Sequence, residues 1–416
     1  MKLAIDGARV QTELHKLATY SDATPVAGAT AVTRVVFSPR DLEARAYLAS
    51  LYAEADLKVR VDAVGNVFVR FEGSDPALPA VGTGSHTDAI PQAGMYDGTV
   101  GVIGGLEALR ALKRAGFKPR RSLEVVMFTS EEPTRFGIGC LGSRLIAGTL
   151  TPDAADALRG TDGRTLLETR TAAGFTGNLA NVRLPLRYYD AWVELHVEQG
   201  PLLEKVGLPI GVVAAIAGPS SYRFIIEGFG GHAGALLMAE RRDALCAASE
   251  IILAVEEAAK GSGAVDTVAT VGTVEVYPGA QNSVPSRVTL QLDLRDTDTA
   301  RRAKVFAAIE VAIADVSVRR GVQIAVSKIN ADEPAVSDEK ILNAIEASAA
   351  EAKLPFQRMV SRAYHDTLFI SRVAPTAMIF VPSKNGASHR PDEFTTQAEI
   401  AQGVELLART LARLAG

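Results

Sequence analysis

Five of the six histidines in this 416-residue chain occupy short glycine-rich or acidic stretches that are typical of loops. The stretches read GSHTD, ELHVEQG, GGHAG, AYHDT and GASHRPDEF, and they carry His86, His196, His232, His365 and His389. His15 lies in a predicted helix and is interpreted as a surface residue. One such loop histidine alone would be an ordinary polar residue. Five together, beside paired acids, predict a metal site, because zinc- and manganese-type ions favour imidazole and carboxylate ligands.

Carboxylates accompany these histidines at two predicted strand ends. Asp88 and Asp97 follow His86 in GSHTDAIPQAGMYDG, and the Asp88 carboxylate is spaced to accept the second ring N–H of His86. Glu131 and Glu132 end the stretch SLEVVMFTSEE. Adjacent carboxylates repel unless a cation or a proton separates them, so one can bind metal while the other holds a proton taken from water. A solvated acidic turn is the alternative for this pair. The acids of RPDEF are interpreted as a helix start without a catalytic role.

The elements that must position these residues alternate between helix and strand over the first half of the chain. The predicted elements are a helix over residues 38–57, two strands over 59–73 around a Gly65-Asn66 turn, a strand that ends near GSH, a helix over 98–114 and a buried strand over 122–132. This alternation predicts an α/β sheet with helices on its faces. Ligands of such sheets bind beyond the carboxyl ends of the strands, where His86 and the Glu131-Glu132 pair are expected.

The pattern changes near residue 220. The predicted order is strand 221–230, helix 242–260, strand 266–278, strand 286–296, helix 300–320 and strand 322–330. In SRVTLQLDLRD, Val288, Leu290, Leu292 and Leu294 face one way and polar residues face the other. The order β-α-β-β-α-β is the ferredoxin-like arrangement. We therefore predict a small ferredoxin-like domain over 215–330, inserted into a larger α/β domain formed by residues 1–214 and 331–416.

Composition excludes several functional classes. The net charge of −4 gives no basic surface for nucleic acid or an anionic membrane. The N-terminal stretch MKLAIDGARVQTELHKL lacks the apolar core of a signal peptide, and the run IGVVAAIAG is far shorter than the ~20 residues that cross a bilayer. Two distant cysteines, Cys140 and Cys246, form no CxxC pattern. A cytoplasmic protein is expected, with no nucleic-acid or membrane partner.

The motifs together resemble a known family. GSHTDAIPQAGMYDGTVGV, TSEEPTRFG with LGSR, ELHVEQGPLLE, GGHAGALLMAERRDA, QNSVPSRVTLQLDLRD and FVPSKNGASHRPDEF are similar, in this order, to the amidohydrolases of linear ureido compounds. These are the N-carbamoyl-L-amino acid hydrolases, allantoate amidohydrolases and ureidoglycolate amidohydrolases of the aminoacylase and carboxypeptidase metallohydrolase superfamily. The resemblance implies a dimetal, aminopeptidase-like α/β catalytic domain whose inserted domain acts as a lid and dimerisation domain.

The resemblance also implies roles for individual residues, carried over by motif. One metal would be held by His86, Asp97 and His196, and Asp97 would bridge to a second metal held by Glu132 and His389. Glu131 would be the general base. Substrate would be contacted by Gln199 and, from the inserted domain, by Asn282 and Arg295. His232 of the inserted domain would be catalytic, stabilising the charge that builds on the carbonyl oxygen. The histidine of the inserted domain can come from the partner subunit in this family, so a homodimer is expected. A surface ion pair with Asp293 or Asp296 is the alternative for Arg295.

Substrate choice is where the sequence departs from many relatives. The stretches EEPTRFG and SRAYHD stand where EEG and SGAGHD are common, and they resemble the ureidoglycolate branch. Tyr364 would fill the pocket and add a hydroxyl donor, which suits ureidoglycolate better than an amino acid with a bulky side chain. Packing of Tyr364 elsewhere in the core is the alternative, and the roles of His365 and Asp366 stay open.

The predicted reaction is therefore hydrolysis of ureidoglycolate to glyoxylate, ammonia and carbon dioxide. N-carbamoyl-L-amino acid and allantoate hydrolysis are the near alternatives, and aminoacylase or dipeptidase activity is more remote. A non-catalytic binding protein with this fold is disfavoured because every ligand and Glu131 are present. Two Mn²⁺ ions per subunit are favoured by resemblance to the ureide branch, while Zn²⁺, Co²⁺ and Ni²⁺ suit the same ligands.

Overall fold

The structure, a computed structural model, describes residues 3–416, and these divide into two compact units. The first unit extends to Ala214 and resumes with Val336–Met359 and His365–Gly416. The second unit comprises Ala215–Ala335 and Val360–Tyr364. The predicted mixed α/β class is confirmed by the elements of both units.

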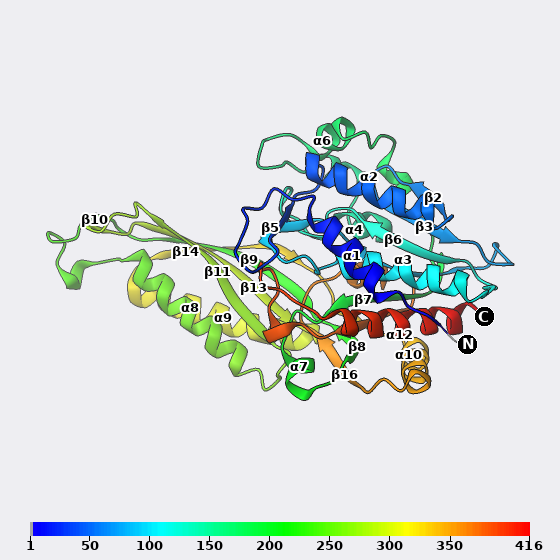
Figure 1. Cartoon of the computed structure of the whole chain (residues 1–416). Helices are drawn as coiled ribbons and strands as arrows, with labels where there is room; N and C mark the ends of the chain where they lie inside the picture. The colour runs from blue at the N-terminus through cyan, green and yellow to red at the C-terminus, as the bar shows by residue number, and fades with distance from the viewer. Residues whose placement is uncertain (1–2) are drawn as a thin grey trace. The chain divides into compact units, whose positions relative to one another are not determined.

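Within residues 3–416, a nine-stranded mixed sheet forms the framework of the first unit (Figure 1). Its strand order is β15-β8-β17-β7-β4-β6-β3-β2, and β16 pairs with β8. The strands are β2 (Lys58–Val61), β3 (Val67–Phe71), β4 (Ala80–His86), β6 (Leu123–Phe128), β7 (Tyr189–Val197), β8 (Ile210–Ile216), β15 (Ala335–Val336), β16 (Phe356–Ser361) and β17 (Thr376–Val381).

Four neighbouring strands of this sheet run in the same direction. The pairs β4–β6, β4–β7 and β17–β7 are all parallel. Their carboxyl ends therefore meet at one edge, where His86 ends β4 and His196 lies one residue before the end of β7. The predicted gathering of polar strand exits at one sheet edge is confirmed.

Helices cover both faces of this sheet. The helices α1 (Gly7–Ala18), α2 (Pro39–Glu54), α3 (Thr99–Arg114), α10 (Glu339–Ala352) and α12 (Gln397–Ala415) contribute to one core together with alternate residues of the strands. Trp192 of β7 faces the other way, because its neighbours Ala191 and Val193 belong to that core. On this second face, Trp192 Nε1 donates to Thr367 Oγ1 in α11 (Thr367–Ile370) at 2.8 Å.

The remaining elements of the first unit are short. They are β1 (Val32–Arg34), which pairs with β5 (Ala89–Ala93), α4 (Leu141–Ala147), α5 (Pro152–Asp156), α6 (Leu166–Ala172), α7 (Leu202–Val206) and the 3-10 turns η1 (Leu179–Val182) and η3 (Lys384–Gly386). The β1–β5 pair was not predicted, because strands of three and five residues carry little periodic signal.

Glycines bring α3 close to the sheet. A Cβ atom on Gly101 would lie 2.4 Å from the Leu195 carbonyl oxygen and 2.6 Å from Ser85 Cβ. Leu195 and Ser85 directly precede the two strand histidines. Since Asp97 lies two residues before α3, this contact fixes the start of the helix, and hence Asp97, against both strand ends.

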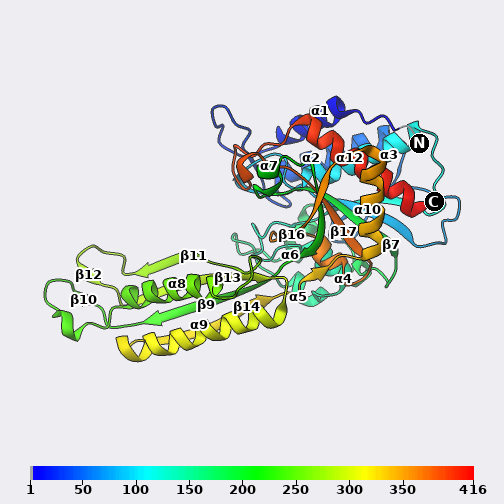
Figure 2. The same ribbon diagram turned by 90° about the horizontal axis from the view of Figure 1, so that it is seen from below.

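The second unit contains a four-stranded antiparallel sheet in the order β11-β13-β9-β14. Its elements are β9 (Gly218–Glu227), β10 (Gly231–His232), η2 (Met238–Glu240), α8 (Ala244–Lys260), β11 (Val268–Tyr277), β12 (Ser283–Val284), β13 (Arg287–Asp296), α9 (Thr299–Arg320) and β14 (Gln323–Ala331). Apart from the short β10, β12 and η2, they follow one another as β-α-β-β-α-β. Figure 2 shows α8 and α9 side by side along the sheet.

The alternation predicted for β13 is confirmed. Val288, Leu290, Leu292 and Leu294 are fully or almost fully buried against α8 and α9. None of the helices formed by residues 3–416 combines the length and the apolar character that a membrane crossing requires.

The close approach of α3 makes a prediction about stability. Substitution Gly101→Ala would favour the helix by ~1 kcal/mol through intrinsic propensity alone. Overlap with the Leu195 carbonyl and Ser85 outweighs this gain, so we expect a net loss of ~1–3 kcal/mol and a lower urea midpoint in metal-free protein. The control is Gly272→Ala in β11, where an added Cβ meets no heavy atom within 4 Å. A midpoint for Gly101→Ala at or above the wild-type value would contradict the packing.

Candidate metal centre

The five predicted metal ligands come together in the first unit. His86, Asp97 and His196 offer ligand atoms that all lie within 4.8 Å of one another. Asp97, Glu132 and His389 form a second group by the same measure. Asp97 belongs to both groups, as a bridging ligand must.

The two oxygens of Asp97 face different groups. Oδ1 lies 3.1 Å from His196 Nε2 and 3.6 Å from His86 Nε2. Oδ2 lies 3.2 Å from His389 Nε2, which is 3.5 Å from Glu132 Oε1. One carboxylate thus separates two clusters of nitrogen and oxygen donors.

Backbone carbonyls fix the orientation of the two strand histidines. His86 Nδ1 lies 3.0 Å from the Asp88 carbonyl oxygen, and His196 Nδ1 lies 2.9 Å from the Val197 carbonyl oxygen. A carbonyl only accepts hydrogen bonds, so each Nδ1 carries a hydrogen and donates it. In the neutral rings each Nε2 then presents its lone pair to the centre. The lone pair of His196 Nε2 accepts the backbone N–H of Gly98 at 3.1 Å, so a metal at this nitrogen would replace that hydrogen bond.

The prediction that the Asp88 carboxylate orients His86 is wrong. Its Oδ1 stays 3.7 Å from His86 Nδ1, because the Asp88 backbone carbonyl already occupies the ring N–H. The carboxylate instead accepts the backbone N–H groups of Glu131 at 3.2 Å and Glu132 at 3.0 Å. Asp88 therefore positions the acidic pair of the neighbouring strand exit.

Glu131 is buried beside the first group. Its Oε2 lies 3.7 Å from His86 Nε2, and its Oε1 accepts the Cys140 thiol hydrogen with Sγ at 3.4 Å. Burial raises the pKa of Glu131 well above its usual range, and the charges of Glu132 and Asp366 add to this effect against that of His86. Burial and the charge of Asp97 likewise raise the pKa of Glu132 to about 7. The pair is buried, so the solvated acidic turn is excluded.

The bridging carboxylate behaves in the opposite way. Burial alone would raise the pKa of Asp97, but hydrogen bonds from His196, His389 and His86 hold it well below its usual range. The hydrogen bond to Asp97 raises the pKa of His389 to about 9 against partial burial. In the absence of metal, protons on the imidazoles therefore supply the positive charge that Asp97 requires.

Gln199, predicted to contact substrate, lies against the bridging ligand. Its Nε2 donates to Asp97 Oδ2 at 2.9 Å and to Ser388 Oγ at 3.1 Å. Its backbone is left-handed, with φ of 57°, as are those of Ser130 and His389 at 58°. Such strain in non-glycine residues gathers at functional sites, where the surrounding structure holds it.

Sequence reasoning missed two buried glutamates. Glu194 is 0% exposed within β7, and its oxygens accept hydrogen bonds from Ser85 Oγ at 2.7 Å and Thr367 Oγ1 at 2.5 Å. With His196 and His365 it forms a third close group, but these hydroxyl bonds already occupy both carboxylate oxygens, so we interpret it as structural. The signal for Glu194 in the sequence was an acidic residue inside the otherwise apolar run AWVELHV.

The second missed residue is Glu393 of RPDEF. The interpretation of this motif as a helix start is wrong, because α12 begins only at Gln397. Glu393 is instead 4% exposed, and its Oε1 accepts the backbone N–H groups of Tyr96 and Asp97. The structure also places His365 and Asp366, whose roles the sequence left open. His365 is buried with its ring edge-on to His196, the centroids 4.6 Å apart, and Asp366 Oδ1 accepts the Ser143 hydroxyl hydrogen at 2.5 Å.

Four predicted substrate residues lie in the second unit. His232 and Asn282 are neighbours there, because β10 pairs with β12 and the Ala233 N–H donates to the Asn282 carbonyl at 2.9 Å. Arg295 forms the alternative ion pair, with Nε and Nη2 donating to Asp293 at 2.8 and 3.0 Å. The Tyr364 hydroxyl donates to Asp332 Oδ2 at 2.9 Å. Their contact with substrate stays a prediction.

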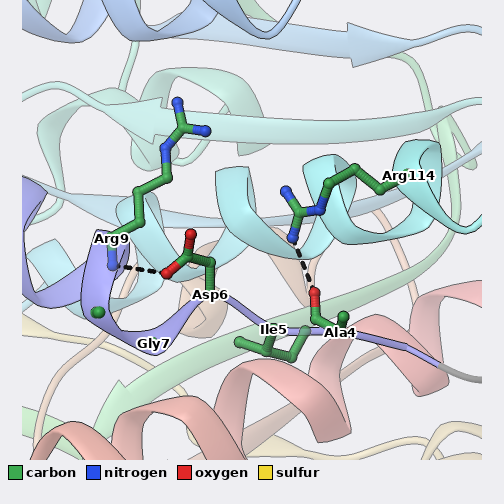
Figure 3. A pocket seen from close by; sticks show the side chains of 7 residues that line it. Ala4, Ile5, Asp6, Gly7, Arg9 and Arg114 are labelled. Atoms are coloured by element: carbon green, nitrogen blue, oxygen red, sulfur yellow. Dashed lines mark hydrogen bonds between the residues drawn. The ribbon is translucent and has the colours of Figure 1, made fainter.

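A separate cavity of about 540 Å³ is lined by residues 4–9 and Arg114 (Figure 3). Its charged groups have partners within the chain: Arg114 donates to the Ala4 carbonyl at 2.8 Å and to Glu107, and Asp6 accepts the Arg9 N–H at 2.9 Å. None of the predicted site residues lines it, so this cavity is distinct from the candidate centre.

The donor set of the centre suits divalent metals. Three imidazole nitrogens and two carboxylates face one another without a thiolate, which is the ligand chemistry of Mn²⁺, Zn²⁺, Co²⁺ or Ni²⁺. Several further carboxylates are buried around them, including Asp88, Glu131 and Glu393. Buried negative charge on this scale requires cations or protons to balance it.

Comparisons with known proteins extend over nearly the whole chain. Residues 82–413 match Peptidase family M20/M25/M40. The ureidoglycolate hydrolase of Oryza sativa subsp. japonica is 48% identical over 417 residues, which cover 99% of this chain and 85% of the relative. The N-carbamoyl-L-amino acid amidohydrolase of Geobacillus stearothermophilus is 39% identical over 389 residues, covering 92% and 93%. The crystal structure of AtUAH in complex with glyoxylate has a TM-score of 0.91 at 46% identity and covers 99% of this chain and 98% of that one.

The raised pKa values predict that metal uptake releases protons. Metal ions bind deprotonated imidazole and carboxylate, whereas His389 with a pKa of about 9 and Glu132 with a pKa of about 7 hold protons in the metal-free centre near neutral pH. Affinity for Mn²⁺ should therefore fall as the pH falls through this window. Calorimetric titration of metal-free protein in buffers of different ionisation enthalpy should show release on the order of one proton or more near pH 7. An observed enthalpy that is the same in every buffer would contradict the assignment.

Proposed function

The chain belongs to Peptidase family M20/M25/M40, and from this membership we propose that it is a metal-dependent amidohydrolase of linear ureido acids whose favoured substrate is ureidoglycolate. The resemblance to the ureido amidohydrolases, first drawn from the motifs, is confirmed by named relatives of both the ureidoglycolate and the N-carbamoyl amino acid type. The observation that carries the proposal is the pair of donor groups sharing Asp97, with Glu131 beside them.

The metal centre is proposed to hold two divalent ions. His86, Asp97 and His196 would hold one, and Asp97, Glu132 and His389 the other. When bound, the ions supply a Lewis acid that polarises the ureido carbonyl and make water more acidic. Mn²⁺ is the favoured ion, and the nitrogen and oxygen donors also suit Zn²⁺, Co²⁺ or Ni²⁺.

Glu131 is proposed as the general base. Its Oε1 is engaged by the Cys140 thiol, so Oε2, which lies 3.7 Å from His86 Nε2, is the oxygen directed at the centre. Oε2 would take a proton from the attacking water and then pass it to the leaving nitrogen. Asp88 supports this role because it holds the backbone N–H groups of both glutamates.

The second unit is proposed as the substrate lid and dimerisation domain, with a ferredoxin-like fold over residues 215–330 and a catalytic domain over 1–214 and 331–416. The division between Ala214 and Ala215 supports the first boundary, and the β-α-β-β-α-β order supports the fold. The second unit extends five residues past the proposed second boundary, to Ala335, and also includes Val360–Tyr364. His232 Nδ1 accepts the Gly234 N–H at 3.1 Å, so the neutral ring carries its proton on Nε2. That N–H would stabilise charge on the carbonyl oxygen, supplied in a homodimer from either subunit.

Recognition of the substrate carboxylate is proposed for Arg295, with Asn282 and Gln199 as further contacts. A guanidinium can bind a carboxylate through two parallel hydrogen bonds, and Arg295 already binds Asp293 in this way. Substrate would therefore compete with Asp293 for the same donors. Tyr364 would restrict the space around the substrate α-carbon, which favours ureidoglycolate over larger N-carbamoyl amino acids.

Ammonia release measured with Mn²⁺-loaded protein tests the substrate. We expect ureidoglycolate to exceed allantoate, N-carbamoylglycine and larger N-carbamoyl amino acids in kcat/KM, with glyoxylate as a product. N-carbamoyl-L-amino acid hydrolysis is the second candidate, supported by the 39% identical relative. Preference for the larger substrates would overturn the role of Tyr364 and leave the reaction class intact, while inactivity toward all of them would overturn the function.

Substitution Glu131→Gln tests the base. The amide keeps the shape of the side chain but cannot accept the proton, so kcat should fall by roughly 10²–10⁴-fold with Mn²⁺ content unchanged. Glu310→Gln, an exposed change in α9, is the control and should keep wild-type kcat. Full activity in Glu131→Gln would exclude Glu131 as the base.

A further inference from the structure

The two metal groups differ in how the chain holds their histidines. His86 and His196 lie within strands of the central sheet and are 2% and 1% exposed. His389 lies in a loop after η3, and 48% of its side chain is exposed. The sheet itself therefore fixes both histidines of the first group, whereas the histidine of the second group depends on the contacts that hold the 389–394 loop against the loop of Asp97.

Glu393 makes that connection. Its Oε1 accepts the backbone N–H of Tyr96 at 2.9 Å and that of Asp97 at 3.0 Å, across almost 300 residues of sequence. The Glu393 side chain comes from the same loop as His389, and one of the two N–H groups that it accepts belongs to the bridging ligand Asp97. No other side chain among the described residues has a hydrogen bond to the Asp97 N–H.

The backbone around Gly94 is built for this contact. A Cβ atom at Gly94 would lie 2.3 Å from Glu393 Cβ and 2.7 Å from its Oε1, so only glycine admits the glutamate at this depth. The adjacent Tyr96 and Phe394 rings also meet edge to face, with centroids 6.1 Å apart. Burial, hydrogen bonding and close packing thus converge on one side chain.

We propose that Glu393 is a positioning residue that clamps the His389 loop to Asp97 and thereby sets the affinity of the second metal group selectively. This inference rests on the proposed two-metal centre and goes beyond it, because it assigns the difference between the two groups to a residue that contacts neither substrate nor metal. Residues that orient metal ligands in this way typically contribute 10–100-fold to metal affinity.

The test is Mn²⁺ binding to metal-free protein, with free Mn²⁺ measured by electron paramagnetic resonance. Wild-type protein is expected to bind two ions. Glu393→Ala should keep the tighter ion within a few-fold and weaken the other by roughly 10–100-fold. Glu393→Gln retains a carbonyl acceptor for the two N–H groups and should restore affinity to near the wild-type value.

Two further variants separate the clamp from general damage to the loop. Asp392→Asn alters the exposed neighbour, which pairs only with Arg390 among the described residues, and should bind both ions as the wild type does. Gly94→Ala keeps the glutamate at position 393 but displaces its side chain, because the added Cβ would overlap it. This variant should weaken binding of the same ion as Glu393→Ala does.

Three results would overturn the clamp: wild-type binding of both ions by Glu393→Ala, equal weakening of both ions, or failure of Glu393→Gln to restore affinity. Wild-type protein that binds fewer than two ions would instead overturn the proposed centre and the clamp with it. Because metal binding is the readout, the outcome does not depend on which ureido acid is the substrate.

Discussion

The structure of the first unit depends on one buried carboxylate having positive partners on both of its oxygens. Asp97 is 7% exposed and lies between three imidazoles, and an ionised carboxylate at that depth without partners would be very costly. The same constraint explains why its pKa is lowered while those of Glu131 and Glu132 are raised. Cations at the centre would bind Asp97 and Glu132 together and would lower the pKa of the neighbouring Glu131, whereas each proton neutralises only one carboxylate.

The fold meets this constraint with backbone contacts. Parallel strands deliver His86 and His196 to one edge, and glycines let the helix that follows Asp97 approach both strands. Gly98 shows how tight the arrangement is: its φ is 65°, and a Cβ there would lie 2.4 Å from His86 Nε2. Any larger residue would therefore occupy the position of the metal-facing nitrogen, so the glycine-rich composition around Asp97 follows from the geometry of the centre.

Much of this was predictable from sequence, because the informative signals are local. Strand exits, paired acids and loop histidines indicated a metal site, and the family resemblance selected the five ligands that the structure gathers. Strict alternation identified the buried face of β13. The failures concern partners that are distant in sequence. Nothing in RPDEF indicates that Glu393 reaches the N–H of Asp97, and spacing alone could not show that the backbone carbonyl of Asp88 would reach the His86 ring before its carboxylate did. By contrast, an ion pair between Arg295 and Asp293 was one of the predicted alternatives, because the two residues lie only two positions apart in the sequence.

The division of the centre into a sheet-held and a loop-held half has an energetic consequence. A donor on a central strand is ordered by the folding of the sheet, so metal binding at the first group requires little further loss of chain entropy. The loop of His389 has fewer such constraints, and each contact that orders it before metal arrives lowers the cost of binding the second ion. Asp97 belongs to both halves, so an ion bound at the first group would also order a ligand of the second. Two metal groups that share one carboxylate but differ in rigidity are expected to fill in sequence, with the strand-held group first.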